Sequence, residues 1–83
     1  MLKVSVISPE SVLFEGEASS VVAPAYDGEI GILENHAPLM TLLGTGSLRL
    51  GSAGADKRFN IEGGFLQVVE NNVRIVTEKA TAA

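Results

Sequence analysis

The only histidine of the chain, His36, is the side chain best suited to proton transfer near neutral pH. Glu34 lies two residues before it and Asp27 stands across a predicted loop, so a carboxylate–histidine pair is one interpretation. A zinc site would need two or three further His or Cys ligands, and the chain has neither. No serine stands in a nucleophile motif such as Gly-x-Ser-x-Gly. We therefore interpret His36 as a structural or interface residue, and we predict no catalytic residue and no metal site.

Two carboxylates, Glu15 and Glu17, share one face of a predicted extended segment, about 7 Å apart at the rise of a strand. That separation falls in the range used by glycosidases. A domain of 83 residues offers little cleft for a sugar, however, so we favour a solvated strand face.

Glycine-rich segments could bind phosphate. Residues 44–46 and 62–64 lack the Lys-Ser/Thr pair of a phosphate-binding loop, and no predicted helix follows them. We interpret both segments as turns, and we predict no cofactor.

Charge and composition restrict the classes of partner. The formal net charge is −4 and the six Lys and Arg residues are scattered, which disfavours nucleic acid. The apolar runs fall well short of the roughly 20 residues of a membrane-spanning helix. Residues 1–3 lead straight into an alternating segment, so we expect no signal or transit peptide and no direct membrane insertion.

The elements that position the residues named above mostly show the two-residue alternation of strands. Leu2, Val4 and Val6 alternate with other residues, and turn signals recur about every eight residues. We expect a bend at Gly16, a hairpin tip within residues 51–56 and a tight hairpin at residues 71–72. The sequence predicts an all-β fold, a small antiparallel β-sandwich or flattened β-barrel of about eight to ten short strands. It would span residues 1–79, with a short tail at 80–83.

The segment from Asp27 to Gly46 holds four of the nine glycines, one of the three prolines and the densest apolar run of the chain. Asp27-Gly28 is typical of a tight turn. A short strand follows, in which Gly31 would let another backbone come close. The apolar run 39–43 fits either a core strand or an exposed contact patch, and we favour the core strand.

Several motifs resemble those of the epsilon subunit of F-type ATP synthase, which is called delta in mitochondria. They are Gly28-Glu29-Ile30-Gly31-Ile32-Leu33, His36-Ala37-Pro38-Leu39, Phe14-Glu15-Gly16 and Glu62-Gly63-Gly64-Phe65-Leu66, in the family's order and spacing over nearly the whole chain. The resemblance implies the N-terminal β-sandwich domain of that subunit. In the family a hairpin of two helices usually follows this domain, and no such hairpin is present in these residues.

The resemblance implies a non-catalytic rotor subunit of the central stalk, which couples proton transport to ATP synthesis. Its partners would be the gamma subunit and the c-ring. It would be peripheral, on the cytoplasmic face of a bacterial inner membrane or on a chloroplast thylakoid, through the ATP synthase complex.

The same resemblance implies two sets of contact residues. Gly28, Glu29 and Ile30 would meet the c-ring, with Glu29 projecting from a rigid loop rather than pairing within a sheet. Ser8, His36 and Thr41 would lie on the side that faces gamma. Glu34 stands where the family often has proline, which predicts a more mobile or differently charged loop before His36.

Two other classes of function remain open. The first is a free-standing β-sandwich module that binds a protein or peptide, with residues 39–43 as its groove. The second is a small-molecule enzyme.

Overall fold

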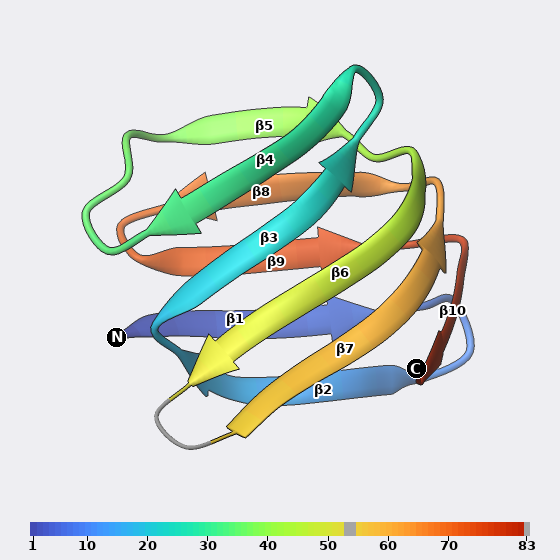
Figure 1. Cartoon of the computed structure of the whole chain (residues 1–83). Coiled ribbons are helices and arrows are strands. Elements are labelled where there is room, and N and C mark those ends of the chain that lie inside the picture. Colours follow the sequence, from blue (N-terminus) through green and yellow to red (C-terminus); the bar gives the residue numbers. More distant parts are fainter. Residues whose placement is uncertain (53–54, 83) are drawn as a thin grey trace.

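The computed structural model describes residues 1–52 and 55–82, and its secondary structure there consists of strands (Figure 1). The strands are β1 (Leu2–Ile7), β2 (Val12–Ala18), β3 (Ser20–Ala25), β4 (Gly28–Leu33), β5 (Leu39–Leu42), β6 (Thr45–Ser52), β7 (Ala55–Glu62), β8 (Phe65–Val69), β9 (Asn72–Val76) and β10 (Lys79–Ala82). They form two layered sheets, which confirms the predicted β-sandwich and the predicted number of strands. In the described part of the chain, no helix is long and apolar enough to cross a membrane.

Each sheet has five strands. Sheet A has the order β2-β1-β9-β8-β5, and sheet B has the order β10-β7-β6-β3-β4. The paired strands run antiparallel except β1 and β9, which run parallel. The sandwich is thus antiparallel as predicted except at this one pair. No hairpin links β1 to β9, so local connection does not force them to be antiparallel.

The core lies between the sheets and follows the alternation seen in the sequence. Leu2, Val4 and Val6 of β1 are at most 1% exposed, whereas Lys3 points to solvent. At the side where β2 faces β7, the rings of Phe14 and Phe59 meet edge to face, 6.4 Å between centroids. The remaining core side chains are Ala18, Val21, Ala23, Ile32, Leu43, Leu48, Leu50, Ile61, Leu66, Val68, Val73 and Ile75.

Two of the predicted turns lie within one residue of the expected place, whereas the predicted turn at residues 44–46 is wrong, because Thr45 and Gly46 pair with β7 as the start of β6. The β3–β4 turn consists of residues 26–27, and Gly28 follows at φ 134° as the first residue of β4. The β8–β9 hairpin turns on Glu70 (φ 48°) and Asn71 (φ 62°), one residue earlier than predicted. Two successive residues at positive φ are the signature of the turn that matches strand twist.

The predicted bend at Gly16 is wrong. Gly16 pairs in register with Val4, and the irregularity of β2 lies nearer its start, where Val12 pairs with Ile7 but Phe14 pairs with Val6. The bulged residue is therefore Leu13, because the two strands differ by one residue there.

The predicted hairpin tip lies partly outside the described residues. β6 and β7 pair up to Ser52 and Ala55, and residues 53–54 between them are not described.

The predicted tail at 80–83 is largely a strand. Residues 79–82 form β10, which pairs antiparallel with β7, and Ala83 lies outside the described residues. Sequence periodicity missed this strand because it is held mainly by backbone pairing with β7, and Ala80 is a small residue that packs against the core. The buried hydroxyl of Thr77 lies 3.3 Å from the Glu62 carbonyl oxygen and 3.0 Å from that of Lys79, so it joins the end of β7 to the start of β10.

Candidate interaction surfaces

The outer face of sheet A carries a continuous row of apolar side chains. Strand register sets one residue of each strand directly beside the next: Val12, Ile7, Val76, Phe65 and Leu42. We call these five residues the apolar row. It crosses all five strands, a distance of about 19 Å at the usual strand spacing. Val12 is 57% exposed and Leu42 is 63% exposed, and the three residues between them are half-buried.

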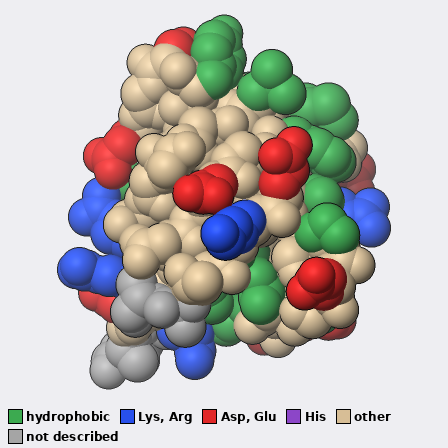
Figure 2. All heavy atoms as spheres, turned by 90° about the vertical axis from the view of Figure 1, so that its right-hand side faces the viewer, with side chains coloured by type: hydrophobic (Ala, Val, Ile, Leu, Met, Phe, Trp, Pro, Cys, Tyr) green, Lys and Arg blue, Asp and Glu red, His purple; other side chains and the backbone are tan. Residues whose placement is uncertain are grey.

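Two further apolar side chains extend the apolar row at its β5 end. Met40 is 64% exposed and lies on the same face as Leu42. Tyr26, in the β3–β4 turn, is 69% exposed, and its backbone N–H donates to the Leu42 carbonyl oxygen at 3.0 Å. Figure 2 shows hydrophobic side chains gathered from the top of the view down its right-hand side. Contiguous exposed apolar surface of this kind marks interaction sites in soluble proteins.

The exposure of β5 corrects the interpretation of residues 39–43 as a core strand. Leu43 is buried, but Met40 and Leu42 face solvent. β5 belongs to a two-layer sandwich, so every second side chain points away from the core, as in the other strands of sheet A. The contact-patch alternative describes these two residues correctly.

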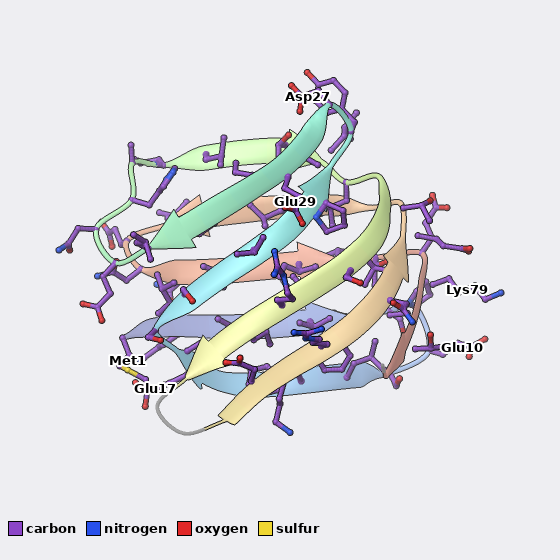
Figure 3. The ribbon with its side chains drawn as sticks, viewed as in Figure 1. Met1, Glu10, Glu17, Asp27, Glu29 and Lys79 are labelled. Carbon is purple, nitrogen blue, oxygen red and sulfur yellow. The ribbon has the colours of Figure 1, made fainter. Side chains whose placement is uncertain are left out.

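The outer face of sheet B is polar around Glu29, and the exposed Leu33 lies on the same face at the end of β4. Glu29 lies within β4, opposite Pro24 of β3, and its Oε2 is 3.4 Å from Nη2 of Arg49 on β6. In Figure 3 Glu29 stands over sheet B, below Asp27 of the β3–β4 turn. The prediction that Glu29 projects from a loop without pairing in a sheet is therefore wrong, because β4 already begins at Gly28. Both side chains of this ion pair are about half exposed, so its net stabilisation is about 0–1 kcal/mol.

Glu15 and Glu17 also lie on a strand face. Both are exposed on the outer face of sheet A, where Glu15 pairs with Ser5 and Glu17 with Lys3. They line an open hollow together with Arg74. The favoured interpretation as a solvated strand face matches this exposure.

The comparisons with known proteins decide the family. The profile described as "ATP synthase, Delta/Epsilon chain, beta-sandwich domain" matches residues 1–83. The chain belongs to this family. The resemblance to the epsilon subunit found in the sequence is thereby confirmed.

Relatives within the delta/epsilon family are ATP synthase epsilon chains. That of Leptospira borgpetersenii is 48% identical over 77 residues, which are 93% of this chain and 61% of the relative. That of Caulobacter vibrioides is 40% identical over 82 residues, which are 99% of this chain and 95% of the relative. The chain spans about three-fifths of the length of the first curated relatives it matches.

Solved structures share the delta/epsilon sandwich fold. A chain of the Euglena gracilis mitochondrial ATP synthase (OSCP/F1/c-ring, rotational state 1) has a TM-score of 0.91 at 23% identity, over 98% of this chain and 52% of that one. A chain of the Tetrahymena thermophila mitochondrial ATP synthase (central stalk and c-ring) has a TM-score of 0.83 at 16% identity, over 96% of this chain and 65% of that one. At these identities the likeness concerns the fold alone.

In this delta/epsilon sandwich, the residues expected to face gamma do not form one cluster. Ser8 follows β1 directly after Ile7 of the apolar row, whereas Thr41 pairs with the buried Leu66 and so lies on the inner side of the edge strand β5. His36 precedes β5, at the end of the sandwich where the Met1 amine lies 3.0 Å from Glu34 Oε1. In Figure 3 Met1 and Glu10 mark opposite ends of the molecule, and Glu10 belongs to the same β1–β2 loop as Ser8.

The residues expected to face the c-ring are contiguous at the start of β4, but they point in different directions. Glu29 points outward from sheet B and Gly28 is exposed. Ile30 is half-buried and packs against the core. Only Glu29 therefore offers a polar side chain to a partner from this set.

In the part of the chain that the structure describes, no catalytic partner lies beside His36. Its Nδ1 lies 2.7 Å from the carbonyl oxygen of Ala37. The neighbouring carboxylate of Glu34 pairs with the amine of Met1 instead. The part of the chain that the structure describes holds no group of three or more His, Cys, Asp or Glu side chains placed to bind a metal ion.

Sequence reasoning missed the apolar row as a unit. The outward positions of Ile7 and Val76 follow from strand alternation. Their alignment with Phe65 and Leu42 depends on strand order and register, which single-sequence patterns do not contain.

Proposed function

We propose that this delta/epsilon domain is a non-catalytic part of the rotor of F-type ATP synthase. It docks on the gamma subunit and on the c-ring, and so helps to couple proton transport to ATP synthesis. It is peripheral to the membrane through the complex, on the cytoplasmic face in a bacterium or at the thylakoid in a chloroplast. The supporting observation is that its two outer faces differ in character, one bearing the apolar row and the other the Glu29–Arg49 pair.

The apolar row is the surface we assign to the gamma subunit. A long-lived contact needs apolar area that leaves water on binding, and the apolar row supplies side chains from five strands in one line. Ser8 would lie in the polar rim of this contact, and we extend the contact past Thr41, at the β5 edge, to His36 in the loop before β5. An interface of ordinary size would bury about 1,200–2,000 Å² in total.

The polar face around Glu29 is the surface we assign to the c-ring. An exposed ion pair contributes little affinity, but it fixes orientation and disfavours wrong partners. Arg49 holds the Glu29 carboxylate over sheet B, so the charge is presented at a fixed place.

Mixing the chain with a gamma subunit, followed by size-exclusion chromatography with light scattering, tests the first contact. We expect a one-to-one complex that Leu42→Asp abolishes, because a carboxylate would replace an exposed apolar group of the apolar row. Thr45→Asp is the matched control, since it adds the same charge at an exposed position of β6 in sheet B. Absence of a complex between well-folded partners would reject docking on gamma by this domain.

A free-standing peptide-binding module is the second candidate. The observation that favours it is the exposure of Met40 and Leu42 on the edge strand β5, which could accept an extended peptide. The same experiment separates the two functions, because a peptide-binding module would form no stoichiometric complex with gamma.

A further inference from the structure

The side chain of Asn71 ties the loop between β4 and β5 to the other sheet. We call residues 34–38 the His36 loop. The backbone N–H of Asn35 donates to Oδ1 of Asn71 at 2.6 Å, and Nδ2 of Asn71 lies 3.5 Å from Oδ1 of Asn35. The carbonyl oxygen of Asn71 accepts from the Lys3 N–H at 2.8 Å. Asn71 therefore links the loop that leaves sheet B to the β8–β9 turn and to β1 of sheet A.

Both asparagines adopt the left-handed backbone conformation. Asn35 has φ 63° and Asn71 has φ 62°. Asparagine and glycine adopt this region far more readily than other residues. The two amides thus meet only because each turn places its asparagine in that conformation.

The His36 loop has further ties of its own. The His36 N–H donates to the Leu33 carbonyl oxygen at 3.3 Å, and Glu34 pairs with the Met1 amine at 3.0 Å. The greater mobility expected from Glu34 in place of proline is thus opposed by side-chain contacts. The Asn71 amide is the contact that joins this loop to a turn of the opposite sheet.

We propose that Asn71 is a positioning residue for docking on the gamma subunit: it holds the His36 loop in the conformation that binds. This inference rests on the proposed function and on the gamma contact that the resemblance implies for His36. A loop that is ordered before binding loses less conformational freedom on association. A loop that is ordered for only part of the time lowers the apparent affinity by that fraction.

Substitutions at Asn71 can separate the side chain from the turn. Asn71→Gly keeps the positive φ and removes both amide contacts. Asn71→Asp keeps the oxygen that accepts from the Asn35 N–H. Asn72→Ala is the control, because within the described part of the chain the Asn72 amide bonds to the Glu70 carbonyl oxygen of the same turn and not to the His36 loop.

We would measure two quantities for each variant of the full chain, the hydrogen exchange rate of the Asn35 N–H and the Kd for gamma. Asn71→Gly should accelerate the exchange and raise the Kd about five- to tenfold, the usual range for loss of a hydrogen bond. Asn71→Asp should restore the Kd to within about twofold, and Asn72→Ala should change neither quantity. In a His36→Ala background, Asn71→Gly should have no further effect on the Kd.

Three results would overturn the inference. One is an unchanged Kd in Asn71→Gly despite faster exchange at Asn35. Another is an equal rise of the Kd in Asn72→Ala, and the third is a full additional loss in the His36→Ala background. If the native chain does not bind gamma, the proposed function fails together with the docking role, whereas the exchange rates still decide whether Asn71 orders the loop.

Discussion

At the scale of one residue, substitution of Glu29 tests the role of the polar face. We expect Glu29→Ala to weaken association with the c-ring and to change the free energy of unfolding by less than about 1 kcal/mol, because its ion pair with Arg49 is exposed. Co-purification with detergent-solubilised c-ring, together with urea unfolding, checks both statements. Glu15→Ala, which removes an exposed carboxylate from sheet A, serves as the control. Ring association equal to that of the native chain would remove Glu29 from the contact.

Substitution by alanine should destabilise the fold strongly at one glycine, Gly64, and only slightly at another, Gly31. Gly64 has φ 106°, and a Cβ there would lie 1.9 Å from the Val76 carbonyl oxygen. Gly31 has open space beside it. We expect Gly64→Ala to destabilise the fold by about 3 kcal/mol or more and Gly31→Ala to change stability by less than about 1 kcal/mol. Urea unfolding of both variants checks this contrast, and similar midpoints for the two would contradict it.

Gly31 also shows where sequence reasoning about single residues fails. The sequence predicts a close backbone approach at Gly31, whereas the close approach occurs at Gly64, where the chain between β9 and β10 passes the turn before β8. Composition identifies both residues as glycine, but only the three-dimensional path decides which of them another segment approaches.

At the scale of elements, one buried hydroxyl adds to the backbone pairing that holds β10. We expect Thr77→Val to cost about 1 kcal/mol, because it keeps the shape of the side chain and removes the contacts to the Glu62 and Lys79 carbonyl oxygens. The amides of residues 79–82 should exchange faster, while those of β8 and β9 keep their protection. Equal acceleration in both sheets would mean that Thr77 stabilises the whole fold instead of this strand.

Alternation predicted the existence of most strands but not their position in a sheet. β1 was predictable because three of its residues alternate into the core. β5 was misjudged because the apolar run 39–43 contains the same residue types whether its strand is central or at an edge. β10 was missed because a strand at the edge needs only backbone pairing, which leaves little trace in side-chain pattern.

At the scale of the whole molecule, the two faces should respond differently to salt. Contact through the apolar row is expected to persist or strengthen between 0.05 and 0.5 M salt, whereas an ion-dependent contact at Glu29 should weaken as the screening length shortens from about 14 to about 4 Å. Titrations of gamma and of the c-ring at both salt concentrations check this prediction. A gamma complex that dissociates at high salt would show that charges, and not the apolar row, hold it.

The sandwich architecture could be predicted in full outline from the sequence, and its contact surfaces could not. Periodicity and turn residues report on each strand by itself. The apolar row and the Glu29–Arg49 pair arise from strands that are distant in sequence, and only register brings them together.

The parallel pair of β1 and β9 has a consequence for the order in which the chain can fold. β1 is an inner strand of sheet A, and one of its two neighbours is among the last strands to be synthesised. During translation β1 can pair with β2 at once, but its other edge waits until β9 has left the ribosome. Non-local pairing of this kind slows folding. The sandwich therefore closes only after β9 has left the ribosome, and until then the backbone groups of β1 that will bond to β9 are available to other chains.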